Sequence, residues 1–376
     1  MTGAMYAAIS GLKAHMSALN VIGNNISNVN TNAYKAARYT FSEALYTSVR
    51  SGSDGEGNSG GRNPAQIGYG SSVGTIDTDM STKNYSPTGF AMDCMIDGDG
   101  FFVMGTDKTV TGVIDQQSLK GMYLSRLGNF EFDANGYMVD GDGNLVYGFL
   151  RTGPTPEDPN VAAPTSPVLT PIRLPMCSIQ ENTTTGQTET IIHWPSVSVS
   201  TDNGGSAGVR DAGTGEDSNT GNTDEELKRL QAASVAIDEA GRITAMTNDQ
   251  KLIVVGYVAI AKVDNPNGVT HSDGRYYQAL GGAGDVHLST VGGALTYIAP
   301  KAEDGGTAEI NETNPSKITI ESSGDTELVT GGLESSGTDL ATEISNMIVI
   351  QRGYQANTRI VTVTDSMLEE LVNMKR

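Results

Sequence analysis

The sequence has few cysteines. Cys94 and Cys177 are the two cysteines among 376 residues, too few for the several bridges that hold small secreted scaffolds together. We expect both to remain free thiols. The four histidines are scattered, so no histidine and cysteine spacing suits a zinc site. The sequence therefore predicts no disulfide framework, no metal site and no cofactor.

Long apolar runs are also missing. No window reaches the roughly 20 apolar residues that a membrane-spanning helix needs. The first residues, "MTGAMYAAISGLKAH", lack a basic start, and Lys13 and His15 interrupt the apolar stretch. We therefore expect neither a membrane span nor a cleaved signal peptide.

Positive charge is scarce in the middle of the chain. The net charge is −20, with +3 on residues 1–50 and −2 on residues 333–376, which leaves −21 on residues 51–332. So acidic a surface makes nucleic acid an improbable partner. The near-neutral ends favour packing against protein.

Apolar residues near the N-terminus recur at the heptad spacing typical of paired helices. They are Met5, Ile9, Leu12, Met16, Leu19, Ile22, Ile26 and Val29. An ordinary amphipathic helix on a globular core would also show such a stripe. A second stripe at the other end of the chain makes pairing of the two ends the stronger interpretation.

The C-terminal stripe is less regular. Its residues at heptad spacing are Leu340, Ile344, Met347, Tyr354, Val361 and Leu368, with polar Gln351 and Thr358 at seam positions. Isolated polar groups in a seam reduce stability but select register and partner. Thr338 or Asp339 can cap this helix.

Asparagine is abundant in the N-terminal stripe. Asn24, Asn25 and Asn28 stand on a stretch with helical periodicity, although asparagine is a mediocre helix former. We expect these amides to hydrogen-bond across subunits in an array of identical helices. The helices would then be weak alone and ordered on assembly.

Between the ends, strand-like alternation is interrupted by Asp-Gly and Asn-Gly pairs, which favour tight hairpin turns. Residues 51–64 have the composition of a flexible linker. We assign 1–33 and 337–376 to a terminal helical coiled-coil domain, 34–90 to a linker and extended connection, 91–150 and 227–281 to an antiparallel β domain, 151–226 to an inserted outer domain or loops, and 282–336 to a second insertion and return connection. The predicted fold class is a multidomain α+β chain.

Two motifs invite a chemical interpretation. Asp140, Asp142 and Asn144 begin like a calcium loop, but Leu145 stands where the loop glycine is needed, so hairpin turns explain them better. Ser206 lies in a Gly-x-Ser-x-Gly pattern without the flanking strand and helix of a nucleophile elbow. We therefore expect no catalytic residues and no enzyme, and keep a secreted hydrolase using Ser206 as the alternative from another functional class.

Four stretches together resemble the bacterial flagellar hook and rod proteins. They are "GLKAHMSALNVIGNNISNVNTNAYK", the β motifs "MIDGDGFFVM" and "YLSRLGNFEFDANGYMVDGDGNLVYGF", and the C-terminal "GLESSGTDLATEISNMIVIQRGYQANTRIVTVTDSMLEELVNMKR". Ala33 departs from the pattern, because the family commonly has glycine there. The insertions at 151–226 and 282–330 match no pattern that we recognise.

The resemblance implies a subunit that polymerises helically into a tube, with paired terminal helices inside and the β domain outside. It also implies export through the flagellar secretion channel without cleavage, and contacts with rod and hook–filament junction proteins, the export apparatus and the hook cap. Because hook proteins often carry an outer domain between the halves of the β domain, the insertion favours a hook subunit that transmits torque from rod to filament. A distal-rod subunit is the alternative within the family.

Overall fold

The computed structural model describes residues 2–52, 54, 60–106, 116–153, 165–181, 188–198, 208–210, 228–230, 235–247, 251–272, 274–293, 295–297, 319–322 and 324–374. The chain divides into two compact units. The first, here called the helical unit, comprises Met1–Met80 and Ser336–Arg376, and the second, the β unit, comprises Ser81–Ser335.

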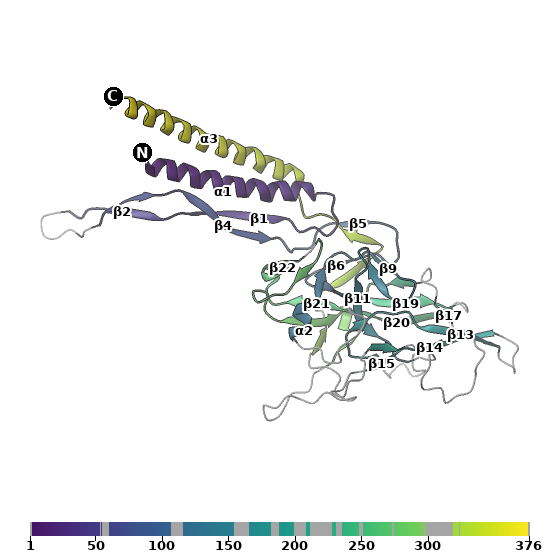
Figure 1. The fold of residues 1–376 in the computed structure, drawn as a ribbon. Coiled ribbons are helices and arrows are strands. Elements are labelled where there is room, and N and C mark those ends of the chain that lie inside the picture. The colour runs from purple at the N-terminus through teal and green to yellow at the C-terminus, as the bar shows by residue number, and fades with distance from the viewer. Residues whose placement is uncertain are drawn as a thin grey trace. The chain divides into compact units, whose positions relative to one another are not determined.

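Two long helices dominate the helical unit. Helix α1 (Thr2–Ser27) and helix α3 (Leu340–Asn373) lie side by side and run in opposite directions (Figure 1). Asp339 caps α3, because its carboxylate accepts a hydrogen bond from the Ala341 backbone nitrogen at 3.1 Å. This agrees with the cap predicted from the sequence. The pairing of the two ends of the chain is likewise present.

A two-stranded arm completes the helical unit. Strand β1 (Ala37–Glu43) pairs with β4 (Ser71–Thr78), and β2 (Tyr46–Arg50) continues outward, paired with β3 (Ala65–Gly68). All pairings are antiparallel. We expected only an extended connection over 34–90, so the arm is a difference from the sequence analysis. Its strands are short and largely exposed on both faces, so they lack the buried alternation that marks a strand in sequence.

Gly70 fits the arm against α1. Its φ of +110° suits glycine, and a β-carbon there would lie 1.9 Å from Ser10 Oγ. The Ser10 hydroxyl donates a hydrogen bond to the Tyr69 carbonyl at 3.3 Å. The arm therefore packs on α1 as part of one folded unit and is not a separate linker.

Fourteen of the strands that the structure describes form the main sheet of the β unit. Along its principal path these are β18 (Val235–Ile237), β19 (Arg242–Met246), β20 (Leu252–Val258), β11 (Leu145–Leu150), β7 (Phe101–Gly105), β21 (Ile260–Val263), β24 (Val286–Thr290) and β25 (Ile320–Ser322). Off the path are β8 (Tyr123–Ser125), β9 (Phe130–Phe132), β10 (Met138–Asp140), β12 (Thr170–Pro171), β22 (Thr270–His271) and β23 (Tyr277–Gln278). All the described pairings in this sheet are antiparallel except β24 with β25.

The core of the β unit lies along its central strands. All residues of β7 and β11 are buried, as expected for strands covered on both faces. Strands β24 and β25 extend the sheet beyond residue 281, where we had placed its end. Residues 168–174 also supply core side chains, among them Leu169 and Ile172, so the β domain reaches past residue 150.

Two further strand pairs close the β unit near its chain ends. Strand β5 (Tyr85–Pro87) pairs with β27 (Gly332–Glu334), and β6 (Cys94–Asp97) pairs with β26 (Glu327–Thr330). Short 3₁₀ turns occur at Pro266–Gly268 and Val291–Gly293. The pairing of β6 with β26 means that the Asp-Gly pairs at residues 97–100 do not form a simple hairpin.

Three other turns have the predicted hairpin form, and one aspartate organises each. The carboxylates of Asp133, Asp140 and Asp238 each accept hydrogen bonds from the backbone nitrogens two and four residues later, at 2.7–3.0 Å. Such side-chain to backbone bonds stabilise turns. Asp140 also accepts a hydrogen bond from the Tyr276 hydroxyl. The carboxylate that resembled a calcium ligand in sequence is thus occupied in holding its own hairpin.

The region expected as an inserted outer domain is described only in part. Strand β13 (Met176–Glu181) pairs with β14 (Thr188–His193) and β17 (Lys228–Arg229), and β15 (Ser196–Ser198) pairs with β16 (Gly208–Arg210). Ser206 lies outside the described residues. Whether this region is an outer domain stays a prediction.

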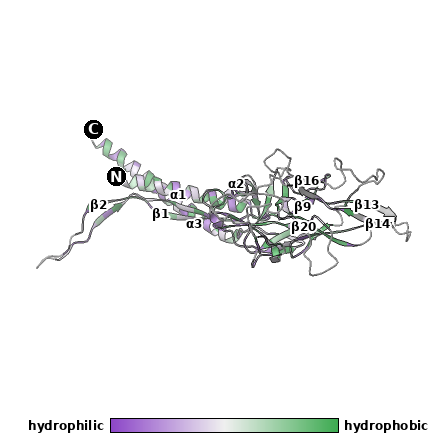
Figure 2. Cartoon of the chain, turned by 90° about the horizontal axis from the view of Figure 1, so that it is seen from below, coloured by the Kyte–Doolittle hydropathy of each residue, from purple (hydrophilic) through white to green (hydrophobic). Residues whose placement is uncertain are grey.

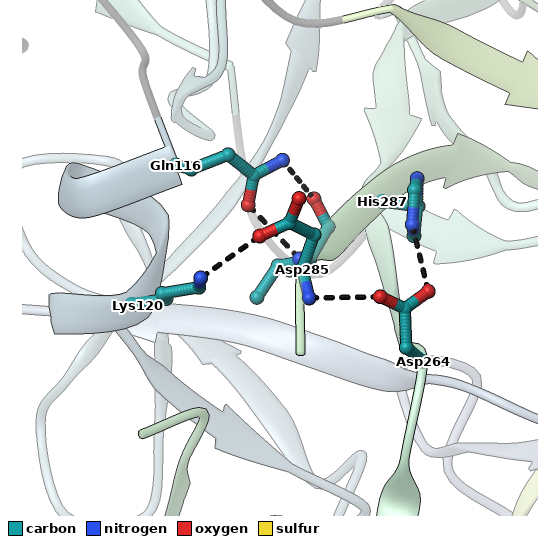
Figure 3. Close-up of polar contacts among 6 residues, drawn as sticks. Gln116, Lys120, Asp264, Asp285 and His287 are labelled. Carbon is teal, nitrogen blue, oxygen red and sulfur yellow. Dashed lines mark hydrogen bonds and ion pairs between the residues drawn. The ribbon is translucent and has the colours of Figure 1, made fainter. Parts of the chain in front are cut away.

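A polar cluster fixes the short helix α2 (Gln116–Gly121) to β24 (Figure 3). The Gln116 amide exchanges two hydrogen bonds of 2.9 Å with the Val286 backbone, and Lys120 Nζ lies 2.9 Å from Asp285 Oδ1. The Asp264 carboxylate accepts a hydrogen bond from the Asp285 backbone nitrogen and makes a second hydrogen bond with His287 Nε2. These two hydrogen bonds hold the pKa of Asp264 below its ordinary value, and the bond from the Asp285 backbone has the larger effect. The cluster is thus explained by a structural role, because its contacts hold α2 against the start of β24.

Candidate assembly surface

The two terminal helices approach each other closely at two glycines. A β-carbon added at Gly11 would lie 2.6 Å from Asn357 Nδ2, and one added at Gly353 would lie 2.8 Å from His15 Cε1. Glycine at these positions lets the helix backbones come close, because neither carries a side chain at the contact. The His15 ring also makes a T-shaped contact with the Phe41 ring of the arm, with ring centroids 5.5 Å apart. The glycines therefore set the spacing of the helical pair.

Apolar side chains fill the space between α1 and α3 toward the C-terminal end of α1. Ala18, Ile22 and Ile350 are buried together, with Leu19, Ile26, Met347 and Tyr39 packed around them. Burying such a side chain contributes on the order of 1.5–3 kcal/mol. The cluster joins α1, α3 and strand β1, so it is the small core of the helical unit.

Asn25 ties the same three elements together by hydrogen bonds. Its side chain is 1% exposed, and its Nδ2 donates to the Ala37 carbonyl at 2.8 Å and to Glu343 Oε1 at 3.0 Å. Its Oδ1 accepts from the Ala37 nitrogen and the Tyr34 hydroxyl, both at 3.0 Å. All four hydrogen-bonding positions of the amide are thus occupied within one chain. The expectation of bonds across subunits is wrong for this residue.

The other asparagines bond locally. Asn24 Nδ2 donates to the Tyr34 hydroxyl at 3.2 Å, and Asn28 Nδ2 donates to Asn24 at the backbone oxygen and Oδ1. Burial raises the pKa of the Tyr34 hydroxyl, and the negative charge of the nearby Glu343 carboxylate raises it further. The neutral Tyr34 hydroxyl donates its hydrogen bond to Asn25. The amides close the end of α1, where helical backbone groups lose their partners.

The turn after α1 contains an unusual residue. Ala33 has a φ of +60°, the left-handed region that costs an L-residue roughly 1–2 kcal/mol. This is the position at which the sequence departs from the commonly found glycine. The left-handed conformation explains the preference for glycine, and alanine is the smallest departure from it.

The residues predicted for the interface fall into three groups. Ile22 and Asn25 are buried. The half-buried residues are Met5, Ile9, Leu12, Leu19, Ile26, Asn28, Val29, Met347, Val361 and Leu368, of which Asn28 and Val29 lie beyond the end of α1. The exposed residues are Met16, Asn24, Leu340, Ile344, Gln351, Tyr354 and Thr358.

The sequence analysis placed one seam of α3 on the wrong face. Gln351 and Thr358 are exposed, whereas Ile350, Gly353 and Asn357 meet α1. The straight helix has 3.6 residues per turn, so a strict seven-residue spacing drifts around it. The glycine and asparagine at the contact also lack the apolar signature on which the pattern search relied.

An apolar stripe on α3 stays exposed beside this contact and was missed by the sequence analysis. Its residues are Val349, Ala356, Ile360, Val363, Met367 and Leu371, separated by three, four or seven positions and all exposed. The exposed fraction of Val363, for example, is 58%. Green hydrophobic and purple hydrophilic segments alternate along both helices in Figure 2. The seven-residue recurrence of Val349, Ala356 and Val363 was the available signal.

The rest of the described chain offers no competing site of familiar chemistry. No helix among the described residues is both long and apolar enough to cross a membrane. Among the same residues no group of three or more histidine, cysteine, aspartate or glutamate side chains could hold a metal ion. Burial raises the pKa of the Cys94 and Cys177 thiols, which lie in the core as free cysteines.

Two protein families match the two ends of the chain. The family described as flagella basal body rod protein matches residues 5–35, and the family described as flagellar basal body rod FlgEFG protein C-terminal matches residues 329–374. The matched segments contain most of α1, the following turn and all of α3. They thus contain the helices that form the candidate surface.

Relatives extend this similarity over the whole chain. The flagellar basal-body rod protein FlgG of Bacillus subtilis is 28% identical, and the flagellar hook protein FlgE of Borreliella burgdorferi is 24% identical, each aligned over the whole of both chains. A solved flagellar hook protein FlgE2 of Helicobacter pylori matches 53% of this chain and 95% of its own, with 10% identity and a TM-score of 0.29.

The chain is a structural protein of the bacterial flagellum. It belongs to the flagellar hook and rod protein family, as the motifs at both ends of its sequence indicated. That family is a structural one and not an enzyme family.

Proposed function

We propose that the chain is a subunit of the flagellar hook, and that it polymerises helically into a tube through its helical unit. The main observation that supports this proposal is the apolar stripe on α3, which includes Val363 and stays exposed although α1 and α3 are paired. A continuous apolar face of this kind marks a protein-interaction surface. A second copy of the chain is the partner that membership of the family supports.

This geometry supports a proposal for the assembly residues. The exposed members of the predicted interface, such as Ile344 and Tyr354, and the missed stripe on α3 would contact neighbouring copies. The buried members, Ile22 and Asn25, would act indirectly by holding α1 against α3. The helices would line the inside of the tube, with the β unit outside them.

The choice of hook over rod is supported by the segment with strands β13–β17, which in sequence follows β12 and precedes β18, where the resemblance to hook proteins led us to expect an outer region. The full-length similarity to hook protein FlgE supports the same choice. A rod subunit is the second candidate, favoured by the full-length similarity to FlgG. Transmission of torque from rod to filament is the role proposed for the hook subunit.

The proposed partners are other copies of the chain, rod and hook–filament junction proteins, the hook cap and the export apparatus. The proposed route to the flagellum is export without a cleaved signal peptide. Determining the N-terminus of the protein in purified flagella would test this route, and a mature chain that begins downstream of α1 would contradict it.

Deleting the gene and imaging purified basal bodies by electron microscopy tests the assignment. A hook subunit predicts complete rods without hooks, and re-expression of the full chain restores the hooks. Truncated rods would favour the second candidate. Normal hooks and rods in the deletion strain would contradict both.

A further inference from the structure

The β unit contains a groove at the point where two neighbouring chain segments separate. Cys94 and Gly128 form an antiparallel bridge, and the Cys94 backbone nitrogen donates to the Gly128 carbonyl at 3.0 Å. Continued pairing in this register would place residues 90–93 opposite residues 129–132. These two segments instead line a groove of about 580 Å³, together with Val235 of β18. The groove therefore lies between two diverging chain segments.

The open edge of β9 faces this groove. Among the described strands β9 pairs with β10 alone, and all of its residues line the groove, whereas one face of a strand would contribute only every second residue. The Asp133 nitrogen donates to the Tyr137 carbonyl at 2.9 Å. Because hydrogen-bonded pairs alternate along an antiparallel ladder, the backbone groups of Phe130 and Phe132 point away from β10. Such edge groups are a template for another strand.

The side chains around the groove suit a segment that combines apolar residues with positive charge. The apolar walls are Met92, Phe130, Phe132 and Val235. Phe90 at the rim is 70% exposed, and so exposed a ring contributes more when another surface covers it. The described lining has two carboxylates and no cation. Asp93 accepts a hydrogen bond from the Thr88 hydroxyl, whereas Glu131 is exposed on β9.

The charge of the chain argues against a second copy as the occupant. Residues 51–332, which include most of the β unit, carry a net charge of −21, so another β unit would be repelled at this acidic rim. Residues 45–68 of the arm are neutral, with two cations and two anions. An extended segment of a different, basic protein is the complementary occupant.

We propose that the groove binds an extended basic segment of a partner protein, which adds to the open edge of β9 as a further strand. Its backbone would exchange hydrogen bonds with Phe130 and Phe132, and its alternate side chains would be apolar. A lysine or arginine would pair with Glu131, and charge pairs at a rim set orientation and register. This contact is separate from self-assembly and applies to a hook or a rod subunit alike.

Hydrogen exchange in the unpolymerised full chain tests the strand addition. The probe is a ten-residue peptide in which valine alternates with threonine and lysine, and its control carries N-methyl groups along the backbone, which block strand pairing. The probe should slow amide exchange at Phe130 and Phe132 about tenfold and leave Glu131, whose backbone faces β10, unchanged. The control should slow neither. Equal effects of the two peptides, or no slowing at either phenylalanine, would overturn the proposal.

A pair of charge removals tests the recognition of positive charge. Glu131→Gln should weaken binding of the same peptide about fivefold, because its lysines lose their partner. Glu321→Gln removes an exposed carboxylate of β25, outside the groove, and should leave binding unchanged. Equal affinities of the two variants would overturn the proposed charge pairing.

Photo-crosslinking in cells identifies the source of the segment. A photoreactive p-benzoylphenylalanine replaces Phe90 in the full chain, and mass spectrometry maps the adducts. We expect an adduct with a second protein, at a segment that contains lysine or arginine among alternating apolar residues. Adducts only with other copies of the chain, adducts only with acidic segments, or no adduct would overturn the proposal.

Discussion

Asn25 Nδ2 donates a hydrogen bond of 3.0 Å to Glu343 Oε1, joining the two ends of the chain across 318 sequence positions. The same amide holds the backbone of Ala37 through two further bonds. A single buried side chain thus fixes α1, α3 and the start of the arm in one arrangement. The contacts that define the helical unit are therefore complete within one chain.

Asn25→Ala should destabilise the helical unit by about 2–3 kcal/mol, because several buried donors and acceptors lose their partner. Thermal unfolding followed by helical circular dichroism measures the loss. Asn24→Ala is the matched control, since Asn24 is exposed and its side chain makes two exposed bonds, one to the Tyr34 hydroxyl and one from Asn28 Nδ2. Equal losses in the two variants would contradict the central role of Asn25.

Gly353→Ala should destabilise the helix pair by about 1–3 kcal/mol, because the new methyl group would collide with the His15 ring. Gly23→Ala is the matched control, since nothing lies within 4 Å of the added carbon. That control should gain about 1 kcal/mol from helix propensity alone. Urea unfolding of both variants gives the comparison, and a gain in both would rule out the close contact.

Ala33 should tolerate glycine but not a β-branched residue. Ala33→Gly relieves the left-handed conformation and loses one buried methyl group, so its free energy of unfolding should stay within about 1 kcal/mol of the parent. Ala33→Val should lose about 2 kcal/mol, because valine disfavours positive φ. Similar stabilities for the two variants would argue against a φ of +60° in solution.

The stability of α3 should depend on pH through its cap. A hydrogen bond from the Thr342 hydroxyl, then one from the Ala341 nitrogen, lower the pKa of Asp339 below its ordinary 3.8. A carboxylate with a depressed folded-state pKa stabilises the fold above the unfolded-state value, and this contribution is lost as the pH falls through the folded-state pKa.

Asp339→Asn tests this dependence, because asparagine also caps helices and does not titrate in this range. Below pH 4 the parent should lose helical stability more steeply than the variant. Parallel pH profiles of thermal unfolding for the two proteins would contradict the role of the Asp339 charge.

Val363→Asp should prevent polymerisation while leaving the helical unit folded. It puts a charge into the apolar stripe, where contact with another copy would bury it at a cost of several kcal/mol. Ser366→Asp changes an exposed residue off the stripe and should still polymerise. Sedimentation of polymers and circular dichroism of the unpolymerised chain separate assembly from folding. Normal polymers from Val363→Asp would show that the stripe is not an interface.

Several features were predictable from residue chemistry. The heptad apolar residues gave the two terminal helices, and the Asp-Gly and Asn-Gly pairs gave the hairpins at Asp133 and Asp140, because these signals are local. The capping role of Asp339 followed in the same way. Local patterns are reliable where a short segment determines its own conformation.

Other features depend on contacts between distant residues. The close approach at Gly353 involves no apolar pattern. The four hydrogen-bond partners of the Asn25 side chain lie in the turn after α1, in β1 and in α3. The arm has exposed strands, so its sequence lacks alternation. The apolar stripe through Val363 was hidden because two stripes with similar spacing share one helix. Tertiary contacts decide which stripe faces α1.

The central claim is that copies of the chain assemble through the face of α3 that its pairing with α1 leaves exposed. A cryo-electron microscopy map of the polymer formed by the full chain tests this most directly. The account predicts that the helical units line the tube and that the stripe from Val349 to Leu371 is buried between copies. A tube in which Val363 faces solvent and only β units touch would contradict it.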